Sequence, residues 1–580
     1  MPMDRRRFLT TSSATLASLA LWGCRDEAQP AGEGGASSAA AADTTVFRGG
    51  VVLPVDAPFS EHTALAIRGN RVLAVGGDDA VLAAAGRGAR IVELDGRTLL
   101  PGFIEPHMHF ALLAALGPID DVGPFVCPTF EEALEALRRV AAGTPPDEWV
   151  MGRQYDPILL DPPRDLTTRE LDAIAPDRPA FVLNASGHIA YVNGRALALA
   201  GYTKDTPDPP GGEIGRGDDG TPNGVLYGQA AFAPILLANA SIGERMSKGF
   251  VGAGIAVGER AARLGITTLC DQAAGGLSGA AEIEGYRLMY AGGRMKARIR
   301  AYLFDAQAAS FDAAGVRFGQ GDALMRVAGW KIVTDGSNQG FTGRQREPYY
   351  TRDTRGIFYV EPEALREKVV ERAGAGFPMS MHGNGDAAID SILDATEHAA
   401  SRGIDVRALR FRIEHASILQ DDQIARMQAL GVSPSFLIHH VHYWGHVMRD
   451  RVFGPEKVKL LDRCRAVEEA GLSWVMHTDA PVSPLGSLHK IRVAVARDLW
   501  KEPETVLAPG ERVPVEAAIR AVTRNAAWLC HSEDEIGSLE PGKLADLVVL
   551  EEDPRRVEPE KISDIRVSQT WMDGERVHGA

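Results

Sequence analysis

The pattern of apolar and polar positions divides the chain into a long middle and two β-rich ends. Residues 44–98 and 535–580 hold short alternating segments such as "ALAIRGNRVLAVG", and such alternation is typical of half-buried strands. The middle alternates apolar strands with helical stretches, as α/β proteins do. Its candidate strands lie at residues 99–109, 266–271, 297–304, 327–336, 378–385, 411–416, 431–436 and 474–481. Eight strand–helix units predict a (β/α)8 TIM-like barrel over residues 99–534, and the two ends together predict a small β-sandwich domain.

One gap in the predicted barrel is too long to be a loop. It separates the first two strands, between residues 109 and 266, and a structureless connection of that length is implausible. Within it, "TFEEALEALRRVAAG" has helical periodicity, whereas "DTPDPPGGEIGRGDDGTPNG" is rich in turn residues. We therefore expect an inserted subdomain at about residues 112–250, with the turn-rich stretch forming a loop or hairpin beside the barrel mouth.

The N-terminus carries features of an export signal. The stretch "DRRRFLT" contains a twin-arginine pair, and the weakly apolar run that ends at "LWGC" is too short for a membrane-spanning helix. Residues 1–23 resemble a bacterial twin-arginine signal, which predicts a periplasmic or cell-envelope protein delivered by the twin-arginine export machinery. An uncleaved N-terminal anchor is the alternative. Cys24 stands where a lipoprotein carries its lipid anchor, and residues 24–43 predict a flexible tether.

Composition and charge narrow the function classes. The chain has 580 residues, of which 45% are hydrophobic and 24% charged, the profile of a globular protein with a large core. A net charge of -15, with no basic run beyond the N-terminus, argues against a nucleic-acid partner. The five cysteines are far apart and show neither a CxxC pair nor a disulfide framework.

Polar residues of metal-binding type end several of the predicted strands. They are His107, His109, Lys331, His382, His415 and Asp479. Residues two apart in a strand point to the same face, so the two histidines of "HMH" could bind one ion. Each residue alone has an ordinary interpretation, such as a hydrogen-bonded histidine, a lysine reaching solvent or an aspartate that caps a turn. Together they would meet at one barrel mouth, where buried charge is costly unless it is paired or bound to metal, and they predict a metal site.

This order of residues resembles that of a known family. The order His-x-His, Lys, His, His, Asp over strands 1, 4, 5, 6 and 8 is similar to that of the metal-dependent amidohydrolase superfamily. Six phrases resemble its amidohydrolase-3 branch, which includes N-substituted formamide deformylases: "LLPGFIEPHMH", "KIVTDGSNQG", "MHGNGDAAID", "RIEHA", "HTDAPVSP" and "GSLEPGKLADLVVL". The resemblance covers roughly residues 45–578, and its motifs are far more specific for the superfamily than for a substrate.

The resemblance implies which residues hold metal. His107 and His109 would hold one divalent ion, and His382 and His415 would hold another. Zn2+ is the expected metal, since imidazole and carboxylate ligands suit it. Lys331 would take up carbon dioxide and become a carbamate, whose two oxygens could bridge both ions.

Asp479 is the candidate catalytic residue. The resemblance implies that it ligates one ion, takes the proton of a metal-activated hydroxide and hands it to the leaving amine. The number of ions stays open, because some relatives use one ion and lack the modified lysine. An unmodified Lys331 would instead orient the substrate as a cation.

Other residues are candidates for substrate binding. His188 in "NASGHIAYVNGRAL" stands where the resembled branch has a histidine beside the substrate pocket, although it could equally hold a loop. Arg344 or Arg346 could bind a substrate carboxylate as a fork, or lie at the surface. The run "LIHHVHYWGH" after strand 7 predicts substrate contacts at the barrel mouth, with an extra metal site as the alternative. Its candidate side chains are His442, Tyr443 and Trp444.

Three function hypotheses remain. The leading one is an exported metal-dependent hydrolase that cleaves a C–N bond, of amide or N-substituted formamide type, in a small molecule. The second is another metal-dependent reaction on the same barrel, by a deaminase, esterase, isomerase or decarboxylase. The third is a non-catalytic tethered binding protein, against which the complete ligand set argues. Association into a homodimer is a further expectation.

Overall fold

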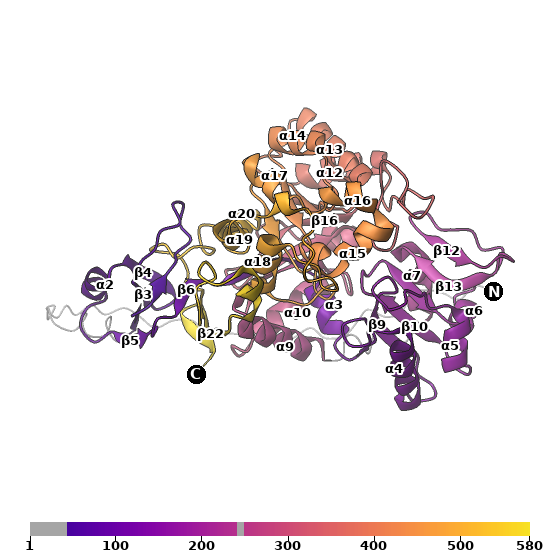
Figure 1. Ribbon diagram of the computed structural model, residues 1–580, viewed down its shortest axis with the longest axis horizontal. Coiled ribbons are helices and arrows are strands. Elements are labelled where there is room, and N and C mark those ends of the chain that lie inside the picture. Colours follow the sequence, from indigo (N-terminus) through magenta and orange to yellow (C-terminus); the bar gives the residue numbers. More distant parts are fainter. Residues whose placement is uncertain (1–42, 240–248, 580) are drawn as a thin grey trace, which may run out of the picture.

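The computed structural model describes residues 43–239 and 249–579 (Figure 1). The predicted export signal, Cys24, all but the last residue of the predicted tether and residues 240–248 of the predicted insertion lie outside these ranges. Within them, a central barrel lies between a small β-rich unit on one side and an inserted subdomain on the other (Figure 1). None of the described helices combines the length and the apolar character that crossing a membrane requires.

Eight parallel strands form the central sheet, in the order β20-β19-β18-β17-β16-β15-β14-β7. The sheet nearly closes, because the chain beyond β20 meets the end of β7. There the backbone N–H of Asp479 donates to the carbonyl of His107 over 3.2 Å, and the N–H of His109 donates to that of Ala480 over 2.8 Å. The predicted TIM-like barrel is therefore confirmed. The strand bounds are Phe103–Met108 (β7), Ile266–Ala274 (β14), Arg298–Phe304 (β15), Met325–Val333 (β16), Met379–Gly383 (β17), Arg412–His415 (β18), Ser433–Phe436 (β19) and Val475–Met476 (β20).

The first predicted strand is in fact two strands. Thr98–Pro101 (β6) pairs with Leu547–Leu550 (β21) in a different sheet, and only β7 belongs to the barrel. The break falls at Gly102, where a Cβ atom would lie 2.3 Å from Thr267 Oγ1, so a larger residue would clash. His109 lies beyond β7 as the N-cap of α3 (Phe110–Ala115), which corrects the expectation that both histidines of "HMH" lie within one strand.

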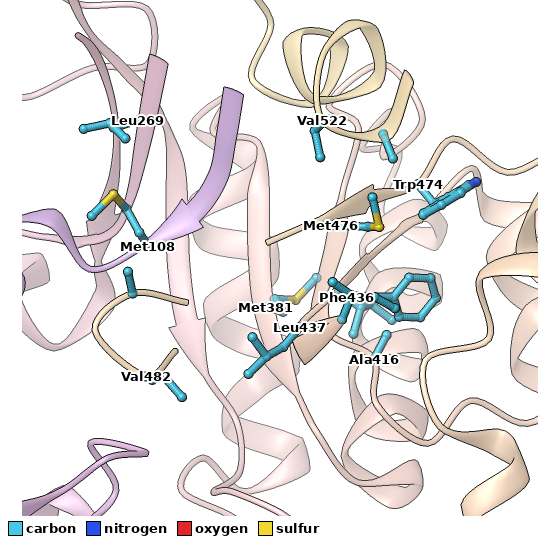
Figure 2. Packing of buried hydrophobic residues seen from close by; sticks show 14 of the residues in the cluster. Met108, Leu269, Met381, Ala416, Phe436, Leu437, Trp474, Met476, Val482 and Val522 are labelled. Atoms are coloured by element: carbon cyan, nitrogen blue, oxygen red, sulfur yellow. The ribbon is translucent and has the colours of Figure 1, made fainter. Parts of the chain in front are cut away.

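Helices cover the outside of the barrel. Many apolar side chains of the strands belong to one large buried cluster, which includes Met381, Phe436 and Met476 (Figure 2). The longest covering helix in the described ranges, α13, buries Ile389, Ile392 and Leu393 on one face. The helices are α9 (Phe250–Arg263), α10 (Ala281–Tyr290), α11 (Ala308–Ala313), α12 (Pro362–Gly374), α13 (Asp386–Ser401), α14 (Asp421–Leu430), α16 (Gly454–Lys457), α17 (Cys464–Glu469), α18 (Ser487–Ala496), α19 (Val515–Ala521) and α20 (Arg524–Leu529).

Both ends of the described chain contribute to one β-rich unit. A five-stranded sheet, β2-β6-β21-β22-β23, combines N-terminal and C-terminal strands, and a four-stranded sheet, β4-β3-β1-β5, comes from the N-terminal part alone. The two sheets share a buried cluster, in which the ring centroids of Phe47 and Trp571 lie 5.1 Å apart. The remaining bounds are Thr44–Arg48 (β1), Val51–Val52 (β2), Ala64–Arg68 (β3), Arg71–Gly76 (β4), Asp78–Ala85 (α2), Arg90–Glu93 (β5), Val567–Met572 (β22) and Glu575–His578 (β23).

The chain between β7 and β14 builds a subdomain around its own sheet. That sheet has the order β12-β13-β11-β10-β9-β8, and the turn-rich stretch of the sequence contains the antiparallel pair β12 and β13. Helix α4 begins at a capping box, in which Thr129 and Glu132 satisfy each other's backbone N–H groups. The bounds are Asp120–Asp121 (β8), Phe130–Gly143 (α4), Val150–Tyr155 (β9), Thr168–Ile174 (α5), Ala180–Asn184 (β10), Ile189–Val192 (β11), Gly194–Leu199 (α6), Glu213–Arg216 (β12), Pro222–Tyr227 (β13) and Gln229–Ala238 (α7).

Candidate metal centre

The predicted metal-binding residues meet at one end of the barrel. Parallel strands bring their carboxyl ends to the same rim, and all of these residues lie at or just beyond such ends. All but one of them are buried, His109 being partly exposed. Their positions are His107 near the end of β7, His109 before α3, Lys331 in β16, His382 in β17, His415 at the end of β18 and Asp479 after β20. The structure brings these residues together, and their role as ligands stays a prediction.

Asp479 lies at the centre of the cluster. Its Oδ1 atom is 3.0 Å from His107 Nε2 and 3.2 Å from His109 Nε2, and its Oδ2 atom is 4.0 Å from His415 Nδ1. The ring centroid of His415 lies 4.3 Å from that of His382 and 5.0 Å from that of His107. One carboxylate and several imidazoles therefore face the same small volume.

Two of these residues are turned into the site by unusual backbone conformations. Glu414 points into the barrel, where it contacts His107, so regular strand alternation would point His415 to the opposite face. Instead, His415 has a φ of 67° and Asp479 a φ of 56°, in the left-handed region that residues other than glycine rarely adopt. Such a conformation costs on the order of 1–3 kcal/mol and is concentrated at functional sites.

A buried carboxylate holds the ring of His107. Glu414 Oε2 lies 2.6 Å from His107 Nδ1, and Arg412 and Ser380 bind the same carboxylate. Burial alone would raise the pKa of Glu414, but Arg412 and His107 outweigh burial and hold that pKa well below its usual value. Since Nδ1 is engaged, His107 presents its Nε2 atom to the site.

Burial also governs the charges of the site. It lowers the pKa of His382 and His415 well below the ordinary value, so both rings are neutral and carry a lone pair for a ligand. Burial lowers the pKa of Lys331 to about 8, although nearby carboxylates oppose this shift. Burial alone would raise the pKa of Asp479, but the facing imidazoles hold it well below its usual value.

Several buried polar atoms of the site have no hydrogen-bond partner within the described part of the chain. Unpaired buried polar atoms are costly, and native proteins seldom tolerate them without a ligand, an ion or a water. Neutral imidazoles and a carboxylate are donors that Zn2+ accepts, so the donor set fits a divalent ion. Ligand atoms of His107, His109 and Asp479 all lie within 4.8 Å of one another, close enough to share one ion. These atoms are His188 Nδ1, Lys331 Nζ, His415 Nδ1, His107 Nε2 and Asp479 Oδ1, and the last two lie 3.0 Å apart without forming a hydrogen bond.

All members of the cluster except His107 line one end of a cavity of about 390 Å3, which we call its floor. Apolar side chains supply most of the walls, and many of them belong to the inserted subdomain. His188 lines the same cavity, with its ring centroid 5.0 Å from that of His382, and burial lowers its pKa to about 4. A cavity of this size and lining suits a small organic molecule.

His442, Tyr443 and Trp444 of the aromatic run after β19 are not among the described residues that line this cavity, and their contact with a substrate stays a prediction. Residues His440–Trp444 form a π-helical turn, which directs their side chains into the protein interior. Trp444 is fully buried and donates from Nε1 to Asp156 over 2.8 Å. His442 Nδ1 lies 2.9 Å from the backbone oxygen of Asp498.

Tyr443 and Arg344 also lie outside the lining of the cavity. Tyr443 stacks on His489, with ring centroids 5.5 Å apart. Arg344 donates to the backbone oxygen of Gly356 over 3.0 Å, so its guanidinium supports a loop and faces no substrate cavity. Of the predicted substrate-binding residues, the structure brings only His188 to the cavity.

Sequence reasoning missed several residues that complete the site. Asp271 near the end of β14 lines the cavity, and the rule of charged residues at strand ends could have found it. Glu414 and His477 stand one and two positions before predicted ligands, and both lie against His107. The apolar wall residues gave no signal, because an apolar side chain in a subdomain is most simply interpreted as core.

Comparison with known proteins identifies the family. The model of the amidohydrolase family, in its amidohydrolase-3 branch, matches residues 90–578, so the chain belongs to this family. An N-substituted formamide deformylase from Arthrobacter pascens is 30% identical over 537 residues, which cover 90% of this chain and 96% of that protein. The resemblance inferred from the motifs is therefore confirmed.

Solved structures share the fold. An uncharacterized metal-dependent hydrolase from Pyrococcus horikoshii has a TM-score of 0.70 at 23% identity, over 89% of this chain and 99% of that one. Another from Pyrococcus furiosus has a TM-score of 0.67 at 24% identity, over 88% of this chain and 100% of that one. The arrangement of barrel, β-rich unit and insertion is thus shared along nearly the whole length of these proteins.

Proposed function

We propose that this chain is a metal-dependent hydrolase that cleaves the C–N bond of an amide or N-substituted formamide. Membership of the amidohydrolase family supports hydrolysis, and the relative from Arthrobacter pascens is an N-substituted formamide deformylase. The observation that carries the proposal is the polar cluster at the floor of a cavity whose walls are mainly apolar. A substrate carbonyl would lie at this floor while the rest of the substrate fills the cavity.

The proposed metal ligands are the residues whose donor atoms face this floor. When bound, divalent ions such as Zn2+ supply a polarised carbonyl and a more acidic water. Lys331 Nζ is buried without a partner in the described chain, which supports its carboxylation, because a carbamate offers two oxygens to cations that an ammonium would repel. We propose that the site would hold two ions, with the carboxylated Lys331 among their ligands. The remaining ligands would be His107, His109, His382, His415 and Asp479.

Asp479 is the residue proposed to move the proton. Asp479 lines the cavity, where its carboxylate can accept a proton from the attacking water. As the water oxygen bonds to the carbonyl carbon and the C–N bond breaks, the same carboxyl group delivers that proton to the departing nitrogen. His188, a neutral ring with an unpaired Nδ1, would orient the substrate from the opposite wall.

The location of the protein is a separate proposal that rests on residues 1–24. The twin-arginine pair supports export of the folded chain to the periplasm or cell envelope, and Cys24 offers an attachment site for a lipid anchor. A homodimer also stays a proposal. None of these proposals changes the chemistry of the barrel mouth.

A product assay tests the proposed reaction. Zinc-loaded protein is incubated with N-benzylformamide, and benzylamine and formate are measured together. We expect the two products in equal amounts, loss of turnover after chelation, and its return when zinc is restored. Asp479→Asn should lower kcat by about 100-fold or more, the contribution expected of a proton-transfer group. Cleavage of the matched ester with no cleavage of the amide, or release of ammonia alone, would overturn the proposal.

A further inference from the structure

The cavity is divided into a polar half and an apolar half that come from different parts of the chain. The polar floor belongs to the barrel. The wall that faces it comes from the inserted subdomain, which lies beside the barrel mouth in Figure 1. Phe181 of β10 and Phe232 of α7 meet edge to face, with ring centroids 6.3 Å apart. The apolar residues that the subdomain contributes to the lining include Ile119, Met151, Phe181, Leu183, Phe232 and Leu236.

Two polar side chains of this wall, Gln154 and Asn184, are committed to contacts within the protein. Gln154 donates to the backbone oxygen of Pro481 over 2.5 Å. The side chain of Asn184 donates to the Tyr191 hydroxyl over 3.0 Å and accepts the N–H of Ser186 over 2.8 Å. These two side chains offer little to a polar substituent, and most of the other residues that the subdomain contributes to the lining are apolar.

Among the described residues that the inserted subdomain contributes to the lining, none is a lysine or an arginine that could pair with an anionic substituent. Among the described lining residues, Lys331 is the only lysine or arginine, and it lies at the polar floor. Asp271 lines the cavity, but its Oδ2 atom accepts the N–H of Ala111 over 3.0 Å and the hydroxyl of Tyr286 over 2.6 Å. An anionic substituent would therefore lose its hydration at this wall without gaining a cationic partner.

We propose that the inserted subdomain selects the substrate, and that Phe181, Phe232 and Leu236 are specificity-determining residues for a bulky, uncharged, apolar substituent on the scissile amide. This inference rests on the proposed amide hydrolysis. The inserted subdomain would select the substrate, and the residues of the barrel mouth would carry out the hydrolysis. An apolar wall discriminates through the area it removes from water, so the preference should grow with the size of the substituent.

Helix α7 offers a matched pair of residues for the test. Leu236 lines the cavity, whereas its neighbour Leu237 is 85% exposed. Leu236→Arg places a cation in the wall, and Leu237→Arg adds the same charge outside it. The substrates are N-methylformamide, N-butylformamide, N-benzylformamide and N-(4-carboxybenzyl)formamide, each measured by kcat/KM with the zinc-loaded protein.

The wild-type protein should prefer the benzyl compound to the methyl compound by at least about tenfold, and should discriminate against the carboxybenzyl compound by about 100-fold. Leu236→Arg should reduce or reverse the discrimination against the carboxybenzyl compound, because the new cation pairs with the substrate carboxylate. Leu237→Arg should leave the relative kcat/KM values of all four compounds unchanged. Phe232→Ala should raise KM for the benzyl compound about tenfold with little effect on the methyl compound.

The outcomes separate the two proposals. If the wild-type protein hydrolyses none of the formamides, the proposed function fails. If it hydrolyses them but shows the same substrate ratios in Leu236→Arg and Leu237→Arg, the function stands and selection by the inserted subdomain is overturned. Leu236 is only partly buried, so its replacement leaves the core of the subdomain in place should Phe232→Ala fail to fold.

Discussion

Glu414 fixes the orientation of His107. Glu414 Oε2 lies 2.6 Å from His107 Nδ1, and both side chains are fully buried at the barrel mouth. A carboxylate on one ring nitrogen of a histidine sets the tautomer and directs the other nitrogen at the site. The arrangement extends inward, because Arg412 binds the same carboxylate. Side chains in the interior of the barrel therefore fix the ring orientation of His107, a proposed metal ligand.

Glu414→Gln should weaken metal binding. The amide keeps the shape of the side chain but removes the negative charge that supports His107, and such changes cost about 10–100-fold in metal affinity. The measurement is the dissociation constant for Zn2+, obtained by competition with a chromogenic chelator. Glu533→Gln is the control, because Glu533 pairs with Arg410 away from the cavity. Equal affinities in the two variants would show that Glu414 does not act on the metal centre.

His188 and His442 should behave differently, because only His188 lines the cavity. His188→Ala should lower kcat/KM about tenfold or more, as removal of a substrate-orienting group does. His442→Ala should lower the melting temperature, since it breaks a buried contact with Asp498, and should leave KM near the wild-type value. Kinetics and thermal melts of both variants test this. A loss of kcat/KM without loss of stability in His442→Ala would return the aromatic run to the substrate site.

These residues show how far the sequence could predict the site. The rule that functional side chains lie at the carboxyl ends of barrel strands brought His107, Lys331 and Asp479 together correctly, because strand ends are fixed by the sheet. The rule fails for loops. Trp444 follows a strand end, but a π-helical turn rotates it onto Asp156, and no local periodicity predicts such a turn. The wall from the insertion was missed for a related reason, since it requires knowing how two units pack.

The strand break at Gly102 depends on packing between distant parts of the chain, which the local sequence pattern does not predict. Gly102 separates a strand of the β-rich unit from a strand of the barrel, yet the apolar run continues across it. Periodicity therefore predicted one strand at residues 99–109. The clash that a Cβ atom would make with Thr267 arises from a strand far along the chain, and only the packed structure reveals it.

Lys490→Met should destabilise the barrel where it closes. Lys490 Nζ lies 2.8 Å from Glu105 Oε2, both are fully buried, and Glu105 also accepts the backbone N–H of Thr478 over 2.9 Å. The replacement leaves a buried carboxylate without its cation, which costs about 3–5 kcal/mol. Chemical denaturation measures the change in the free energy of unfolding. Arg366→Met is the control, because its ion pair with Glu363 is exposed and such pairs contribute about 0–1 kcal/mol. Equal midpoints for the two variants would contradict the predicted role in closure.

Asp156→Asn should change how stability depends on pH. Burial raises the pKa of Asp156 from 3.8 to about 6, although the hydrogen bond from Trp444 opposes this shift. A raised folded-state pKa means that stability is greatest when the group is protonated and is lost as pH rises through about 6. A shift of about 2 units corresponds to ~3 kcal/mol. The asparagine variant should avoid this loss, so its melting temperature relative to wild type should rise between pH 4 and pH 7.

The comparison needs a second aspartate variant. Asp218→Asn, at an exposed turn, should follow the wild-type curve throughout this pH range. If the melting curves of Asp156→Asn and wild type run parallel from acid to neutral pH, the buried carboxyl group is not the source of the dependence.

Metal content per chain tests most directly whether the barrel mouth is a metal centre. Elemental analysis of protein purified without chelator should give about two divalent ions per chain, the number that a bridged pair requires. Lys331→Ala should lose most of this metal, while Lys204→Ala, at an exposed position of the insertion, should retain it. About one ion in both variants and in wild type would remove Lys331 from the metal site. No bound ion, and none regained after incubation with zinc, would contradict the metal centre itself.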